Sequence, residues 1–458
     1  MSSARVVLSL SLLAAGVPAA GGEAGAVFSC ESGGFSQGEE AFSPCVNNHY
    51  GLSARQEALL DELMRRSFDY FVEQADPATG LVRDRARLDG SAYKGDAGSV
   101  ASMAATGFGL SALCVGAERG WISRPDAEAR AERTLSFLVE KSTEVRGWFY
   151  HFVEPSTGER RWNSELSSID TGLLLSGALT AKGCFSGNEK IASLADRLYG
   201  RIDFAWMLDA KRGLLSHGWY PESGFIKTDW DTYSEHLGLA LLAIGAPKPV
   251  PPSLWENWRR DEVVYGTYSY VSASAPLFVH QYSHAYFDFR GLRDTVPPFT
   301  DLFANSISAT YAHRQFCVDI SSKFPSYSEK MWGISASDFK GGYVAWGGPP
   351  LHPATDGTVV PCAAGGSLMF TPEISVPVLM AMKERYPKAW GRYGLVDSFN
   401  PADGWYAKDV LGIDLGITLL SAENLRTGNV WKWFMSNPEP RRALELAGLR
   451  GGEKTGGK

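Results

Sequence analysis

The chain has 458 residues, of which 44% are hydrophobic and 21% charged, a balance that excludes wholesale disorder. Its 44 Lys and Arg against 51 Asp and Glu give a net charge of −7, which argues against nucleic acid and polyanions as partners. The chain also carries 14 Trp, 18 Tyr and 23 Phe, a large supply of flat side chains. The length allows two or three domains, or one large all-helical or barrel domain.

The N-terminus has the pattern of a secretory signal peptide. Arg5 precedes an apolar run that ends near Pro18-Ala19-Ala20 and is too short for a stable membrane span. A lipoprotein site at Cys30 is disfavoured by the bulky Phe28 before it. We therefore expect a protein in the periplasm or outside the cell, without a membrane span. The expected parts are a signal peptide (1–22), an N-terminal extension (23–52), a catalytic domain (53–440) and a flexible tail (441–458).

The cysteines and histidines predict no metal site or cofactor. An even count of six Cys in an exported protein permits disulfides, and Cys30 with Cys45 is the favoured pair. Cys114 and Cys184 lie in apolar helical stretches and are expected to be buried thiols. His280 and His284 lack a nearby acidic third ligand, so we interpret them as core or surface histidines.

Helical periodicity dominates the first half of the chain. Long loops alternate with short turns between the predicted helices, so an antiparallel array would gather the long loops at one end. Residues 245–370 are less regular, and we expect helices there to be interrupted by long loops and small β hairpins. The predicted helices are 53–75, 99–119, 123–142, 168–184, a fifth ending near 208, and 233–244.

Every second predicted helix is poor in charge and rich in small and apolar residues. Helices that are apolar all round belong inside a fold, so those starting at 99, 168 and 233 form an inner set. Thr106–Leu113 resembles Thr171–Leu179, and Glu235–Leu242 occupies the matching place further on. This period of about 65 residues per helix pair allows about six pairs. The pattern predicts an all-α (α/α)6 toroid with long loops on one face and no partner subunit.

Three carboxylates lie near the beginnings of these inner helices, at Asp170, Glu235 and Asp414. Carboxylates there can simply favour the helix dipole, but their equivalent repeat positions favour a function. Paired carboxylates near aromatic loop residues are typical of glycoside hydrolysis, which needs a proton donor and a base or nucleophile. The sequence therefore predicts that Asp170, Glu235 and Asp414 carry the chemistry, with Asp170 holding a sugar hydroxyl or orienting water.

Several motifs give the chain a family resemblance. They are Tyr327-Ser328-Glu329, Trp332-Gly333, Thr371-Pro372-Glu373, Asp397-Ser398-Phe399-Asn400, Ile413-Asp414 and Glu423-Asn424, with Arg426-Thr427-Gly428 and Trp431-Lys432 near the end. With these residues the chain, from about residue 57 to 438, resembles the glycoamylase-like proteins of glycoside hydrolase family 144, which include endo-β-1,2-glucanases.

The resemblance implies an (α/α)6 toroid that hydrolyses β-1,2-linked glucose polymers with inversion and without a metal. It assigns the proton donor to Glu235 and the base to Asp414. The family's Asp-x-x-Glu-Thr motif is replaced here by Ser167-Ser168-Ile169-Asp170-Thr171. The residues expected to bind substrate are Trp162, Trp230, Tyr233, Glu329, Trp332, Asp338, Glu373 and Trp405, of which Glu329, Asp338 and Glu373 are equally explained as loop anchors.

Three other functions remain open from the sequence. A polysaccharide lyase could use Tyr233, His236 and Arg290, although the negative charge of the chain is unfavourable for a uronate substrate. A glucan transglycosylase would differ only in having a sugar as the acceptor. A glycan-binding protein of the same fold would bind without turnover.

Overall fold

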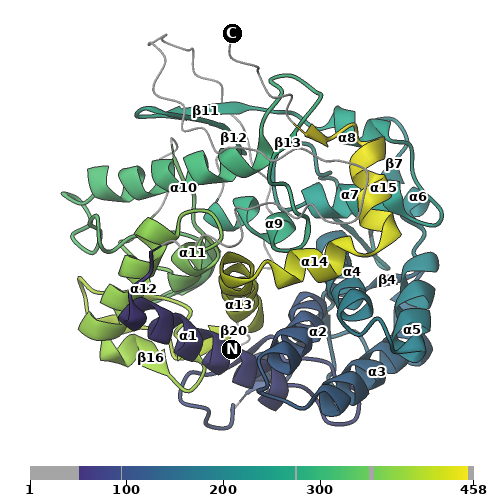
Figure 1. Cartoon of the computed structure of the whole chain (residues 1–458), viewed down its shortest axis with the longest axis horizontal. Coiled ribbons are helices and arrows are strands. Elements are labelled where there is room, and N and C mark those ends of the chain that lie inside the picture. Colours follow the sequence, from purple (N-terminus) through teal and green to yellow (C-terminus); the bar gives the residue numbers. More distant parts are fainter. Residues whose placement is uncertain (1–50, 94, 274–275, 350–354, 452–458) are drawn as a thin grey trace. The chain divides into compact units, whose positions relative to one another are not determined.

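The computed structural model describes residues 51–451, apart from residues 94, 274–275 and 350–354, and all of these lie in one compact unit of the chain. They form a mostly helical structure with many short strands (Figure 1), which confirms the expected predominance of helix. The proposed signal peptide and the Cys30–Cys45 pair lie outside the described residues. Within these ranges, no helix combines the length and apolar character that crossing a membrane requires.

The helices follow one another along nearly the whole described chain. They are α1 Ala54–Glu73, α2 Met103–Glu118, α3 Arg124–Glu140, α4 Ser168–Cys184, α5 Glu189–Gly200, α6 Phe204–Met207, α7 Leu237–Gly245, α8 Ser253–Asn257, α9 Tyr282–Tyr286, α10 Leu302–Asp319, α11 Pro361–Gly365, α12 Pro372–Arg385, α13 Gly412–Arg426, α14 Asn429–Met435 and α15 Pro438–Leu446.

The strands are short and pair antiparallel between and within the loops. The pairs are β1 Arg85–Arg87 with β20 Asp409–Leu411, β2 Ala101–Ser102 with β5 Phe152–Val153, β3 Glu144–Val145 with β4 Trp148–Phe149, β7 Leu208–Asp209 with β8 Leu214–Leu215, β11 Glu262–Tyr265 with β12 Tyr268–Val271, β13 Leu292–Arg293 with β21 Arg450–Gly451, β14 Ala336–Phe339 with β15 Gly342–Ala345, β16 Trp390–Gly391 with β17 Gly394–Leu395, and β18 Phe399–Asn400 with β19 Trp405–Tyr406. One group has three strands, in which β9 Gly218–Tyr220 lies between β6 Leu166–Ser167 and β10 Gly224–Phe225.

The predicted contrast between inner and outer helices is present. Every residue of α7 is buried, and so are most residues of α2 and α4, whereas α3 and α5 bury only one face. The outer helices also have side-chain caps, since Ser53 makes a capping box at α1 and Ser123 caps α3. Amphipathic periodicity and caps therefore suffice to locate these elements.

Two glycines allow the backbones of α2 and α4 to touch. A Cβ atom added to Gly177 of α4 would lie 2.0 Å from the carbonyl oxygen of Gly107, and one added to Gly107 of α2 would lie 2.4 Å from the carbonyl oxygen of Leu173. Backbone cannot move aside as a flexible side chain can. The small residues of the repeat are thus required by this helix contact, which holds α4 and its first turn in place.

We expect Gly177→Ala to lower the free energy of unfolding by about 1–3 kcal/mol, because the clash with Gly107 outweighs the better helix propensity of Ala. Urea unfolding followed by circular dichroism measures the loss. The control is Gly187→Ala, where the added Cβ meets nothing within 4 Å. Equal stability of the Gly177 variant and the wild type would show that the helices can separate without cost.

Several predicted boundaries are wrong, each for a local reason. The second helix begins at Met103 rather than 99, because residues 96–102 form a 3-10 turn and strand β2, and Ser102 then caps the helix. The fifth ends at Gly200, and Asp203 caps the separate helix α6. The sixth begins at Leu237 rather than 233, so Glu235 lies in the turn before α7.

The segment 245–370 has the predicted mixed character, with the hairpins β11–β12 and β14–β15 between short helices and the longer α10. The flexible tail does not begin at residue 441. Helix α15 continues to Leu446, where Pro440, Ala443 and Leu444 are buried, and Arg450 pairs with Arg293 in the strand pair β13–β21.

Four buried histidines make stability sensitive to acid. Burial lowers the pKa of His236, His280, His284 and His313 to about 3, so each is neutral in the folded protein. In the unfolded chain each would titrate near 6.5. Folding stability is therefore fully present above pH 6.5 and declines as the pH falls toward 3, since the unfolded chain then binds more protons.

We expect the free energy of unfolding to fall steeply between pH 6.5 and 4, by up to about 5 kcal/mol per pH unit if all four histidines contribute. Urea titrations at pH 7.5, 6 and 5 measure this slope. The raised pKa values of Glu235 and Asp414 act in the opposite direction and reduce it. A free energy of unfolding that stays constant from pH 7.5 to 5 would contradict the prediction.

Candidate active site

Carboxyl groups from separate segments gather at one site, which we call the acidic cluster. Asp170 lies in the first turn of α4, Asp414 in the first turn of α13, and Glu235 in the turn before α7. The remaining members come from loops and short strands. They are Asp84, before β1; Asp338, on β14; and Asp397, before β18.

Glu235 is half-buried, and hydrogen bonds to the backbone hold the turn that carries it. Ser283 of α9 donates its hydroxyl to the Glu235 carbonyl at 2.7 Å, and the same hydroxyl accepts the Gly238 N–H at 2.8 Å. This link fixes the turn against the start of α7. Burial raises the pKa of Glu235 to about 7, and the charge of Asp170 adds to the rise.

Asp414 is more enclosed, with 8% of its surface exposed. Burial raises its pKa to about 7, against the effect of hydrogen bonds from the side chains of Asp397 and Cys362. Tyr282 of α9 is close enough to both Asp414 and Glu235 to be affected by their charges. Burial raises the pKa of Tyr282, and the charges of both Asp414 and Glu235 raise it further. The two carboxyls therefore belong to one electrostatic site.

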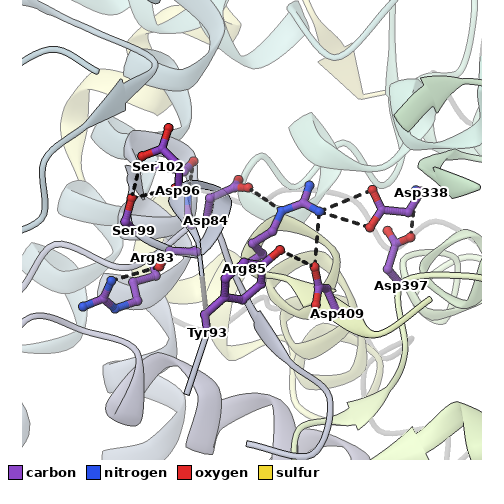
Figure 2. A network of polar contacts seen from close by, with 12 residues as sticks. Arg83, Asp84, Arg85, Tyr93, Asp96, Ser99, Ser102, Asp338, Asp397 and Asp409 are labelled. Atoms are coloured by element: carbon purple, nitrogen blue, oxygen red, sulfur yellow. Dashed lines mark hydrogen bonds and ion pairs between the residues drawn. The ribbon is translucent and has the colours of Figure 1, made fainter. Parts of the chain in front are cut away.

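Arg85 of β1 places a fixed positive charge within the acidic cluster (Figure 2). Its guanidinium lies 3.1 Å from Asp338, 3.3 Å from Asp84 and 3.5 Å from Asp409. Only 11% of the Arg85 side chain is exposed. Burial raises the pKa of Asp338, although Arg85 opposes that rise. Asp397 lies beside Asp338 and accepts its backbone N–H at 2.8 Å.

A second cation lies on the other side of Asp170. His151 is 3.0 Å from Glu165 through Nδ1 and 3.5 Å from Asp170 through Nε2. Burial alone would lower its pKa, but the charges of Asp170 and Glu165 prevail and raise it to about 9. His151 is thus an imidazolium at neutral pH. Ser167, the N-cap of α4, also donates its hydroxyl to Asp170.

This arrangement can move protons at neutral pH. Carboxyls that titrate near 7 can act as acid or base there, and fixed cations hold their neighbours ionised. No group of three or more His, Cys, Asp or Glu among the described residues could hold a metal ion. The carboxyls of the acidic cluster are groups that acid–base catalysis uses.

Some of the candidates from the sequence join the acidic cluster. Asp170, Glu235, Asp414 and Asp338 are members of it. Trp230 lies next to it, since its indole N–H donates to Ser168 at 2.9 Å in the first turn of α4, and its ring stacks on His217 at 3.9 Å.

Two other candidates, Tyr233 and Trp332, are not placed to contact a substrate directly. Tyr233 and Trp332 are both 0% exposed and are part of the hydrophobic core. Tyr233 packs against His280 at 4.8 Å, and Trp332 lies beside His313 at 6.3 Å. The aromatic character of these loop residues could not distinguish a packing ring from an exposed one.

The remaining candidates lie in local contacts of their own. Glu373, at the start of α12, accepts the Tyr311 hydroxyl of α10, and Glu329 lies 3.5 Å from Arg314. Trp405 is half-buried on β19. Trp162 is half-buried and donates its indole N–H to Asp96. The contact of Glu373 fits the alternative of a structural anchor.

The sequence predicted no role for two members of the acidic cluster, Asp84 and Asp397, or for the two cations beside it, Arg85 and His151. Asp84, Arg85 and His151 belong to segments outside the helical repeat. Asp397 stands in a quoted motif but received no role. Its signal was an acidic residue between apolar Val396 and Ser398, at a position that turns out to be 2% exposed.

Comparisons with known proteins agree with the resemblance that the sequence motifs indicated. Residues 227–438 match the family model Glycoamylase, described as "Putative glucoamylase". The resemblance extends over most of the chain at the level of structure. A crystal structure of a putative glucoamylase from Bacteroides caccae matches with a TM-score of 0.80 and 29% identity, over 87% of this chain and 100% of that one.

Two further relatives carry more specific names. The chain is 27% identical over 428 residues to the exo β-1,2-glucooligosaccharide sophorohydrolase (non-reducing end) of Parabacteroides distasonis, a match that covers 85% of this chain but only 57% of that protein. The structure of an endo-β-1,2-glucanase from Chitinophaga pinensis, in complex with sophorotriose and glucose, matches with a TM-score of 0.80 and 28% identity over 87% of this chain and 99% of that one.

Proposed function

We propose that this protein is a glycoside hydrolase that cleaves β-1,2-glucan by inverting acid–base catalysis. The names of two relatives, a β-1,2-glucooligosaccharide sophorohydrolase and an endo-β-1,2-glucanase, state that they act on β-1,2-linked glucose. The chain spans 57% of the curated relative, so the activity is proposed for this chain on its own site. We also propose that its helices form an (α/α)6 toroid, and that residues 1–22 direct export to the periplasm or the medium.

The observation that carries this proposal is the pair formed by Glu235 and Asp414. Both carboxyls have a pKa raised to about 7, and the charges of both raise the pKa of Tyr282. Glycoside hydrolysis needs one carboxyl that stays protonated and one that is ionised. Glu235 has an acidic neighbour, Asp170, that opposes its ionisation, whereas Asp414 receives hydrogen bonds that favour its ionised form.

The reaction follows from these roles. Glu235 donates its proton to the glycosidic oxygen as the bond from that oxygen to the anomeric carbon breaks. Asp414 takes a proton from water, directly or through a substrate hydroxyl, as the water oxygen bonds to the same carbon from the opposite face. The products are two sugar ends, with the proton lost by Glu235 on the leaving oxygen and the proton from water on Asp414.

The charge of the site favours a neutral sugar. The acidic cluster has six carboxyls against two partly exposed cations, Arg85 and His151, that are already ion-paired. An anionic substrate would be repelled. Asp170, bound by His151 and Ser167, is a fixed acceptor for a sugar hydroxyl, and the half-buried Trp230 beside it offers a flat ring.

The lyase alternative is not favoured by the contacts of its residues. Tyr233 is fully buried, His236 is 2% exposed with a pKa near 3, and Arg290 is 2.6 Å from Asp288. Transglycosylation and binding without turnover use the same site, and product analysis separates them from hydrolysis.

The test is to incubate the purified mature protein with linear glucans of defined linkage and to follow reducing ends, product sizes and the anomeric configuration of new ends by proton NMR. We expect reducing ends from β-1,2-glucan alone, released as the α-anomer. Longer products without net new ends would indicate transglycosylation. A folded protein that releases nothing from any glucan would overturn the proposal.

A further inference from the structure

We propose that Asp397 and Asp414 form a buried carboxyl pair that shares one proton, in which Asp397 is the positioning residue that holds the proton and Asp414 is the ionised partner. This inference rests on the proposed function for its kinetic consequence, since Asp414 is the base there. The pair itself follows from contacts that do not depend on the substrate.

The first observation is how Asp397 is bound. One of its oxygens, Oδ2, accepts both the Asp338 N–H at 2.8 Å and the Ser398 hydroxyl at 2.6 Å. Its other oxygen, Oδ1, is buried and accepts no hydrogen bond from any of the described residues. Asp397 is thus oriented by two donors on one oxygen, which leaves the second oxygen free to carry a proton.

The second observation is that Asp414 lies in side-chain contact with Asp397 and also has an unpaired buried oxygen, Oδ2. The two are 2% and 8% exposed. The backbone holds them together, because the Asp397 N–H donates to the carbonyl of Asp409 at 3.0 Å, on the strand β20 that leads into α13. Two adjacent carboxylates removed from water cannot both be ionised at little cost.

The surrounding groups decide which carboxyl keeps the proton. Burial raises the pKa of Asp397, the charges of Asp338 and Asp414 raise it further, and the hydrogen bond from Ser398 only partly opposes this rise. Asp414 instead receives hydrogen bonds from Asp397 and from the Cys362 thiol of α11. The other charged or titratable groups facing the pair are Asp84 and Arg85 from the β1 segment, Tyr343 from β15 and Tyr282 from α9.

The consequence for catalysis is a base that stays ionised while Glu235 stays protonated. A protonated Asp397 donates a hydrogen bond to the Asp414 carboxylate and adds no second negative charge. Asn is the natural mimic of that state. Its carbonyl oxygen can replace Oδ2 as acceptor for Asp338 and Ser398, and its NH₂ group can donate toward Asp414.

The kinetic test compares Asp397→Asn with Asp397→Ala on β-1,2-glucan over a range of pH. We expect the Asn variant to keep kcat within a few-fold of the wild type. The Ala variant should shift the acid limb of the pH profile upward by about one to two units, the effect of losing one hydrogen bond to a charged group. An Asn variant as inactive as the Ala variant, or an Ala variant with an unchanged profile, would overturn the proposal.

A spectroscopic test needs no substrate and no Ala variant. Infrared spectra of protein labelled with ¹³C at the aspartate carboxyl carbon should show the C=O stretch of a protonated aspartic acid at pH 9, where Asp414, whose pKa is about 7, is ionised. We expect this band to disappear in Asp397→Asn and to remain in the control Asp403→Asn, where Asp403 is an exposed residue whose Asx turn Asn can also form. A band unchanged in Asp397→Asn would overturn the pair. If the band disappears in Asp397→Asn but the protein cleaves no glucan, the proposed function is wrong and the carboxyl pair is still supported.

Discussion

Replacing Glu235 with Gln should reduce turnover of β-1,2-glucan by about 10²–10⁴-fold while the fold remains intact, because Gln keeps the shape of the side chain but cannot give a proton to the leaving oxygen. The measurement is kcat from reducing ends, with circular dichroism as the check on folding. Near-wild-type turnover would remove Glu235 from the role of acid.

The leaving group distinguishes a lost acid from a lost base. An aryl β-glucoside or sophoroside with a nitrophenolate leaving group needs little protonation, so Glu235→Gln should retain much more activity on it than on glucan. Asp414→Asn should lose activity on both substrates, because water attack still lacks its base. Equal losses for the two variants on the aryl substrate would contradict the assigned division of labour.

The same assignment fixes the pH dependence. Activity should fall at low pH as Asp414 is protonated and at high pH as Glu235 loses its proton. With both pKa values near 7, the wild type should show a narrow bell centred close to neutrality. Glu235→Gln should lose the alkaline limb and keep the acid limb.

The helical scaffold was accessible from the sequence because its determinants are local. A few neighbouring residues are enough to indicate a helix at each of these places, namely the caps at Ser53 and Ser123 and the apolar stretches of α2, α4 and α7. The boundaries failed where a tertiary contact decides them. Residues 101–102 pair with residues 152–153, and no pattern near residue 101 foretells that partner.

The residues of the site likewise divide into those that local sequence indicates and those that depend on distant contacts. Asp170 and Asp414 were found because a charge in an apolar helix is conspicuous and because the repeat places them alike. Arg85 and His151 were not, since each acquires its role from partners distant in the chain, such as Asp338 for Arg85. Tyr233 and Trp332 show the converse error, in which a motif residue next to the chemistry turned out to be core packing.

Arg85 is expected to be the residue of the acidic cluster whose loss costs most stability. Arg85→Met leaves Asp84 and Asp338 without their guanidinium partner, with only 12% and 19% of their side chains exposed. Removing one member of a buried ion pair costs about 3–5 kcal/mol, because the remaining charges have lost their compensation. Urea unfolding at pH 7.5 measures this loss.

Arg87→Met is the matched control on the same strand. Arg87 is 29% exposed and contacts Asp409 at 2.8 Å, but Asp409 also accepts the Tyr93 hydroxyl at 2.8 Å and lies 3.5 Å from Arg85. Its loss should cost about 1 kcal/mol or less. The deficit of Arg85→Met should also shrink at pH 5, because the pKa of Asp338, which burial raises and Arg85 opposes, rises further without Arg85, so that Asp338 then takes up a proton. If both variants lose the same stability, or if the Arg85 deficit does not change with pH, the charge of Arg85 does not hold the cluster together.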